Sequence, residues 1–167
     1  MQKGSGFSKG LIAISLLLAG APALAIEIDG RIGADEWQAA KHTTDFRKVQ
    51  PLNGQPGTLA TEAWLLATPE GLAVAVRNTQ PPSVPRTLQR VQRDFEDQVD
   101  RVNVMVDFDG DGRTGYVFRI SCTGAIYDGI VTNETSFNKD WDGNWRHAVL
   151  QDESGWTVEI LIPWHIA

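Results

Sequence analysis

The fold class is most evident in residues 101–121, RVNVMVDFDGDGRTGYVFRIS. Apolar and polar residues alternate through both of its halves, which is the pattern of a β-strand with one buried face. The two Asp-Gly pairs between the halves are typical of a hairpin turn. The stretch therefore predicts two antiparallel strands, and their buried face carries Val102, Val104, Val106, Tyr116, Phe118 and Ile120.

The same signal recurs on both sides of this stretch. TEAWLLAT (61–68) and GLAVAVRNT (71–79) flank a Pro-Glu-Gly turn, and AIYDGIV (125–131) follows Thr123-Gly124. WRHAVLQ (145–151) and WTVEILI (156–162) flank an Asp-Glu-Ser-Gly turn. Many short strands with regular turns and little helix predict an all-β fold, a jelly-roll-like antiparallel β-sandwich.

One short helix is expected near the start of this domain. In ADEWQAAK, residues 34–41, the spacing of Trp37 and Ala40 places both on one side of a helix.

The first 25 residues have the three parts of a secretory signal peptide. Lys3 and Lys9 form a basic start, residues 11–19 are an apolar run, and Ala23-Leu24-Ala25 offers small residues for cleavage. The apolar run is too short for a membrane-spanning helix, which needs about 20 residues. Alternatively, the apolar run could serve as an N-terminal membrane anchor or form a buried helix. We expect export to the periplasm, outer membrane or extracellular space, and one mature domain over residues 26–167.

The charge and the cysteine content narrow the function further. The chain has 21 acidic and 15 basic residues, a net charge of −6, which argues against nucleic-acid binding and fits cations or neutral ligands such as sugars.

The lone Cys122 cannot form an internal disulfide and is expected to be a small buried core residue.

The turn DFDGDG, residues 107–112, has two interpretations. Asp107, Asp109 and Asp111 have the alternate spacing of a calcium loop, and backbone carbonyls and water would complete the shell. The twelfth position of such a loop is Phe118 instead of glutamate, so the turn is not an EF-hand. Alternatively, the Asp-Gly pairs only build the hairpin. A second acidic group, made of Asp94, Glu96, Asp97 and Asp100, precedes the strand and is expected to be a solvated loop.

Several segments together resemble carbohydrate-binding module family 9. They are IDGRIGADEW near the mature start, DRVNVMVDFDGDGRTGYVFRI, YDGIV, WDGNW and GWTVEILIPW, and the similarity covers nearly all of residues 26–166. The match is closest to the branch at the N-terminus of exported bacterial proteins, where an outer-membrane barrel domain follows. In that branch another strand comes after GWTVEILIP, so the resemblance implies that this chain is a fragment lacking its last strand.

The resemblance implies a non-catalytic, saccharide-binding β-sandwich with a role in carbohydrate catabolism. Members of this family often hold structural calcium and often accompany glycoside hydrolases. The expected partners are a saccharide and, in the longer protein, the barrel domain.

The residues offer a candidate sugar site in NKDWDGNW, residues 138–145. Aromatic rings bury the C–H faces of sugars, and polar side chains bind their hydroxyls. Trp141, Trp145 and Asn144 are therefore candidates, although both indoles can instead fold inward and cap the core. Arg119 points away from the buried face of its strand, so it can line a concave face with Asp100, or form a surface salt bridge.

Two other classes of function stay open. The first is a structural or docking domain of an outer-membrane protein that binds no soluble sugar. The second is an enzyme, a glycoside hydrolase component, which needs two suitably spaced carboxylates. No catalytic residue is predicted, because no motif marks such a pair. Glu159 lies on a strand between core residues and is expected to be an exposed sheet residue.

Overall fold

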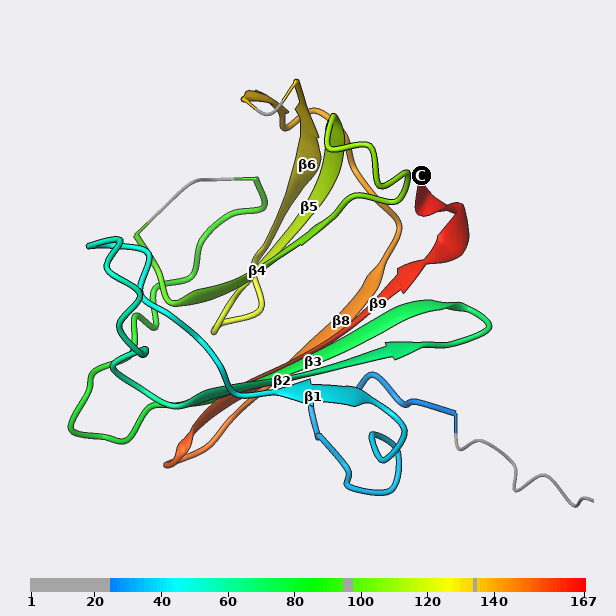
Figure 1. Cartoon of the computed structure of the whole chain (residues 1–167). Coiled ribbons are helices and arrows are strands. Elements are labelled where there is room, and N and C mark those ends of the chain that lie inside the picture. The colour runs from blue at the N-terminus through cyan, green and yellow to red at the C-terminus, as the bar shows by residue number, and fades with distance from the viewer. Residues whose placement is uncertain (1–24, 95–97, 134) are drawn as a thin grey trace, which may run out of the picture.

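The computed structural model describes residues 25–94, 98–133 and 135–167, so the predicted signal peptide lies outside the described part of the chain (Figure 1). The strands in this part are β1 Lys41–Thr43, β2 Thr61–Ala67, β3 Gly71–Thr79, β4 Arg101–Val106, β5 Thr114–Ser121, β6 Ile126–Thr132, β7 Ser136–Asn138, β8 Arg146–Gln151 and β9 Gly155–Pro163. A short 3₁₀ turn, η1 Trp164–Ile166, follows β9. No helix in the described residues is long and apolar enough to cross a membrane.

The strands form two antiparallel sheets that face each other. Sheet one has the order β1-β2-β3-β9-β8, and sheet two has the order β4-β5-β6-β7. Figure 1 shows sheet two above sheet one, with long loops on the left. The predicted all-β sandwich is therefore confirmed, and so are the three hairpins that the sequence predicted.

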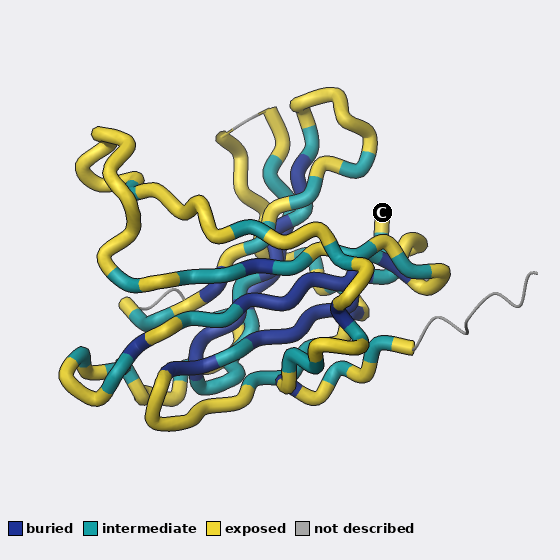
Figure 2. Tube along the Cα trace, turned by 60° about the horizontal axis from the view of Figure 1, so that its bottom comes forward, coloured by how far each residue is buried: buried dark blue, intermediate teal, exposed yellow. Residues whose placement is uncertain are grey.

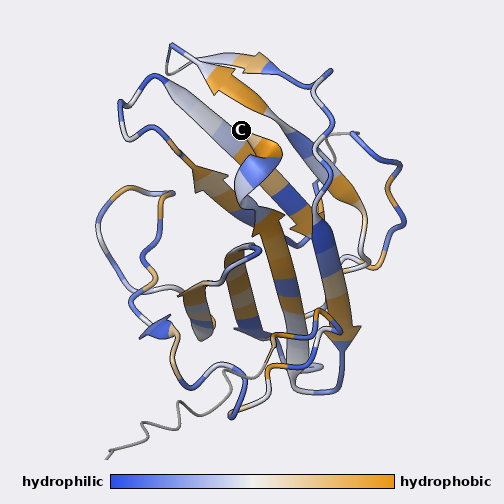
Figure 3. Ribbon diagram, turned by 90° about the vertical axis from the view of Figure 1, so that its right-hand side faces the viewer, coloured by the Kyte–Doolittle hydropathy of each residue, from blue (hydrophilic) through white to orange (hydrophobic). Residues whose placement is uncertain are grey.

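The main core fills the space between the two sheets. Val102, Phe118 and Ile120 from sheet two are buried against Val158 and Ile160 from sheet one. The predicted strand phase is confirmed, because Val104, Val106 and Tyr116 also pack against this core. Cys122 is fully buried in it, as expected. Figure 2 shows that burial concentrates in the strands, whereas the loops are mostly exposed, and Figure 3 shows hydrophobic residues concentrated in the strands.

Strand β9 lies in the interior of sheet one and pairs along its length with β3, while β8 covers its other edge. Its residues are buried on both faces of the sheet. A strand that is buried on both faces is expected to be almost entirely apolar. Residues 158–162, VEILI, fit this expectation except at Glu159.

A second, smaller core covers the outer face of sheet one. Ala73, Ala75 and Leu161 are buried there beneath the N-terminal segment 25–40, which contributes the buried Trp37. In Figure 1 this segment lies below sheet one, on the side away from sheet two. The expected helix over residues 34–41 is wrong. The segment forms turns, with Trp37 N bonded to the Gly33 carbonyl and Ala40 N to the Trp37 carbonyl, and these turns lay the Trp37 indole on the sheet.

The interpretation of Glu159 as an exposed residue is wrong, because the N-terminal segment covers it. Its side chain is fully buried and holds the segment in place. Glu159 Oε2 accepts the backbone N–H of Asp29 at 3.0 Å and of Gly30 at 2.9 Å, and Oε1 accepts Trp37 Nε1–H at 3.0 Å. Burial raises the pKa of Glu159 even though these three donors act to lower it.

Candidate functional site

The outer face of sheet two carries a cluster of aromatic and cationic side chains. The rings of Tyr127 and Phe137 stack with centroids 5.4 Å apart and an interplanar angle of 8°. The Arg119 guanidinium lies 4.8 Å from the Tyr127 ring centroid and 5.3 Å from that of Phe137. Such cation–π contacts hold the guanidinium in a defined place. We call these three residues the arginine–aromatic cluster.

Two glycines let side chains lie flat on this face. An added Cβ at Gly129 would approach the Phe137 ring to 2.6 Å, so the ring lies directly over the Gly129 backbone. An added Cβ at Gly115 would meet Met105 at 3.3 Å. Phe137 is 36% exposed and Met105 is 60% exposed, whereas Val117 on the same face of β5 is buried. The result is an apolar surface with an exposed ring at its edge.

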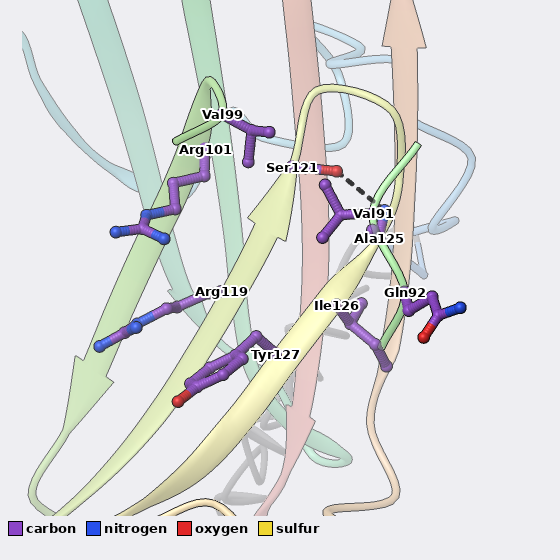
Figure 4. Close-up of a pocket in the computed structure, with 9 residues that line it drawn as sticks. All are labelled: Val91, Gln92, Val99, Arg101, Arg119, Ser121, Ala125, Ile126 and Tyr127. Carbon is purple, nitrogen blue, oxygen red and sulfur yellow. Dashed lines mark hydrogen bonds between the residues drawn. The ribbon is translucent and has the colours of Figure 1, made fainter. Parts of the chain in front are cut away.

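A small pocket adjoins the cluster, and Figure 4 shows its lining residues. Arg101, Arg119 and Tyr127 come from three neighbouring strands, and their polar ends point to the same side. The cavity has a volume of about 20 Å³, room for about one water molecule. A sugar-sized ligand therefore has to rest on the face of the sheet beside this pocket and cannot enter it.

Of the predicted sugar-binding residues, only Arg119 belongs to this cluster. Asp100 is directed elsewhere, because its Oδ2 accepts the Thr87 backbone N–H at 2.7 Å and Gln80 Nε2–H at 3.4 Å. Asp100 thus fastens the loop after β3 to the start of β4. The structure does not bring Asp100 and Arg119 together.

The two predicted tryptophans pack inward. Trp145 is 8% exposed and lies in the main core, with its ring edge-on to Phe118 and its Nε1–H donated to Asp128. Trp141 is partly buried, and its ring meets those of Tyr116 and Phe118 edge to face. Asn144 is exposed between them. This arrangement is the inward-folding alternative that the sequence left open, and the exposed ring of Phe137 was missed.

The aspartate turn after β4 is closed by its own hydrogen bonds. Asp107 Oδ1 accepts Gly110 N–H and Oδ2 accepts Gly112 N–H, each at 2.8 Å. These amides, the one from Gly112 most, lower the pKa of Asp107. Both glycines have positive φ, 67° and 70°, which suits glycine. Asp111 Oδ1 accepts Arg113 N–H at 2.7 Å. The hairpin interpretation accounts for this bonding, and calcium binding by the three aspartates stays a prediction.

We expect calcium to leave the melting temperature unchanged, because turn amides already occupy both oxygens of Asp107. Changing Asp109→Asn and Asp111→Asn together is expected to leave the melting temperature equal or slightly raised, since repulsion between carboxylates falls. Calorimetry with calcium and then with chelator tests this. A calcium-dependent rise of roughly 5–10 °C that the double variant abolishes would establish a metal site instead.

A different acidic group gathers at the side of the sandwich. Asp94, Asp128 and Asp142 each place a carboxylate oxygen within 4.8 Å of the others. Arg93 supplies the balancing charge. Its Nη2 lies 3.0 Å from Asp128 Oδ1 and 2.6 Å from Asp142 Oδ1, and its Nε lies 3.2 Å from Asp94 Oδ2. Asp94 therefore belongs to an ion-pair network and not to a solvated loop, and Glu96 and Asp97 of the predicted acidic group lie outside the described residues.

Asp128 is the buried centre of this group. Its side chain is fully buried on the inner face of β6, and its Oδ2 accepts Gly143 N–H at 2.8 Å and Trp145 Nε1–H at 3.0 Å. Asp128 therefore ties β6 to the segment 139–145 that links β7 in one sheet to β8 in the other. The contacts of this carboxylate therefore stabilise the fold by holding the segment 139–145 against β6.

Comparisons of the chain with protein-family models, with curated proteins and with solved structures each return no match. The resemblance to carbohydrate-binding module family 9 therefore stays a prediction. The structure itself defines the chain as an antiparallel β-sandwich with an arginine–aromatic cluster on the outer face of its smaller sheet.

Proposed function

We propose that this protein is a non-catalytic carbohydrate-binding module of an exported bacterial protein, and that it binds saccharide on the outer face of sheet two. The arginine–aromatic cluster is the observation that carries the proposal. It sets an exposed phenyl ring, Phe137, beside a guanidinium that two ring contacts hold in place.

The chemistry of this face fits a sugar. A pyranose ring has a C–H face that packs on an aromatic ring, and hydroxyls that accept hydrogen bonds from arginine and amide groups. Phe137 offers the ring, while Arg119 and the exposed Asn103, paired across β4 and β5, offer polar groups. A flat sheet face suits a polysaccharide chain, which can continue beyond the contact on either side.

The setting of the module is part of the proposal. The expected signal peptide would export it, and the saccharide would be a substrate of carbohydrate catabolism. A barrel domain of the longer protein would be its second partner.

Replacing Phe137 with alanine is expected to weaken saccharide binding roughly tenfold or more, because an interface residue of this kind contributes more than about 1.4 kcal/mol when buried by a ligand. Affinity gel electrophoresis against soluble polysaccharides, followed by titration calorimetry on those that retard the protein, measures the loss. Trp141→Phe provides the matched control. Its ring packs on the core, so binding should persist.

Binding to no member of a broad glycan panel would contradict the proposed function. Binding that survives Phe137→Ala but is lost in Trp141→Phe would move the site to the predicted loop 138–145.

One observation favours the docking domain as a second candidate. Val49 and Leu52 lie three positions apart in the loop between β1 and β2 and are 77% and 88% exposed, and exposed apolar side chains that gather in one place mark interaction sites. Under this function the domain binds no soluble saccharide. Changing both residues to serine would then abolish the co-sedimentation of the separate domain with isolated outer membranes, with no change in its melting temperature.

A further inference from the structure

The strand positions on the outer face of sheet two carry basic but no acidic side chains, although the chain as a whole is acidic. The strand register assigns eleven described positions to this face. They are Arg101, Asn103, Met105, Gly115, Val117, Arg119, Ser121, Tyr127, Gly129, Val131 and Phe137. Two of these are arginines and none is a carboxylate, whereas the chain contains more acidic than basic residues. The strands thus place guanidinium groups on the same face as the exposed Phe137 ring.

The two arginines can act on one ligand. Arg101 pairs with Ser121 and Arg119 pairs with Asn103, so the arginines are diagonal neighbours on adjacent strands. Long side chains in such positions are within reach of each other. Both line the small pocket, and Figure 4 shows their guanidinium groups extending to the same side of the sheet. Each guanidinium has five N–H donors, so it can bind an anion in addition to other partners.

We propose that the ligand of this face is an acidic saccharide, a polymer of uronic acids, whose carboxylate binds Arg101 and Arg119 while its ring packs on Phe137. This inference rests on the proposed carbohydrate-binding function and adds the class of sugar. Guanidinium groups bind carboxylates through paired, charge-assisted hydrogen bonds, which select both charge and planar shape.

The position of Arg119 separates this site from a general anion patch. The Arg119 guanidinium lies within 5.3 Å of both aromatic centroids, so a carboxylate bound to it lies close to the Phe137 ring. A uronic acid carries its carboxylate on the ring carbon next to the ring oxygen, so one residue can fill both contacts. A phosphate polymer can meet the charge but offers no C–H face for the phenyl ring.

The test compares polymers that differ only in charge. Polygalacturonate, hyaluronan and alginate are titrated into the mature domain by calorimetry, each beside its methyl-esterified form. We expect at least one acidic polymer to bind at least tenfold more tightly than its ester, and its affinity to fall as salt is raised. Arg101→Gln is expected to weaken that binding about tenfold, Arg101→Lys to recover only part of it, and Phe137→Ala to weaken it as well.

Controls separate the inference from the function on which it rests. Arg31→Gln removes an equally exposed arginine on the far side of sheet one and should leave binding unchanged. Equal binding of acid and ester, with loss in Phe137→Ala, overturns the acidic ligand and leaves the carbohydrate-binding function standing. Polyphosphate binding as tight as that of the uronate overturns it in favour of a general anion patch. Binding to no saccharide, neutral or acidic, overturns both.

Discussion

Replacing Asp128 with alanine is expected to lower the free energy of unfolding by about 3 kcal/mol or more. The change leaves Gly143 N–H and Trp145 Nε1–H without their acceptor in the interior, and each buried unpaired donor costs about 1–3 kcal/mol. It also removes the carboxylate that Arg93 meets inside the protein. For a domain of this size the melting temperature should fall by roughly 10 °C or more.

Matched variants identify which contact is responsible. Trp145→Phe removes the indole donor and some ring volume, while the carboxylate keeps its bond to Gly143 N–H, so a cost below that of Asp128→Ala would assign the remainder to Gly143 and Arg93. Urea unfolding monitored by circular dichroism gives the free energies. If Asp128→Ala unfolds at the same urea concentration as the parent, the carboxylate does not hold the segment 139–145 to β6.

Replacing Glu159 with alanine is expected to detach the N-terminal segment 25–40 from sheet one. Three N–H donors lose their acceptor, and the segment restores their hydration by leaving the sheet. The free energy of unfolding should fall by about 2–3 kcal/mol. Hydrogen exchange measures the effect directly, because the amides of Gly30 and Trp37 should lose protection while those of β5 keep theirs. Unchanged protection at Gly30 would show that the apolar contacts of Trp37 suffice.

The same carboxyl gives the stability a pH dependence of known sign. Burial raises the pKa of Glu159 above its ordinary value of 4.5, so the folded protein holds this proton more tightly than the unfolded chain does. The contribution of Glu159 to stability is therefore complete below pH 4.5 and declines as the pH rises through the raised pKa. Asp107 and Asp152 have lowered pKa values. Their contributions to stability are therefore present at higher pH and are lost as the pH falls through the lowered pKa.

Glu159→Gln isolates the effect of this one group. Its amide does not titrate, so the difference in unfolding free energy between parent and variant follows Glu159 alone. We expect that difference to shift against the parent as the pH rises from 4 toward neutrality. A difference that stays constant over this range would mean that the pKa of Glu159 is the same in the folded and unfolded states.

The sequence predicted those parts of the fold that depend on local pattern. Alternation in residues 101–121 placed Phe118 and Ile120 in the core, and the turn residues located the hairpins. The same pattern misplaced Glu159, because alternation shows only that a side chain points away from the main core. Residues that lie 122–130 positions earlier in the chain cover that position, and no local pattern predicts this contact.

The candidate site was harder to predict for the same reason. Phe137 is a candidate binding residue because its ring lies over Gly129 and next to Arg119, which is two strands away. Both contacts depend on the pairing of β6 with β7. The motif WDGNW drew attention to Trp141 and Trp145 because indoles are typical of sugar sites. The buried acceptor Asp128 instead turns Trp145 inward, which only the folded structure shows.

The interior position of β9 has a consequence for biosynthesis. Sheet one stays divided until residues 155–163 are available, since β8 reaches β3 only through β9. Pairing such as that of Val74 with Ile160 joins parts of the chain that are far apart in sequence, and contacts of this kind form slowly. Until those residues have left the ribosome, the emerging chain cannot complete the sandwich. During that interval the edge of β3 that β9 later covers stays unpaired, and an unpaired strand edge is open to association with other chains.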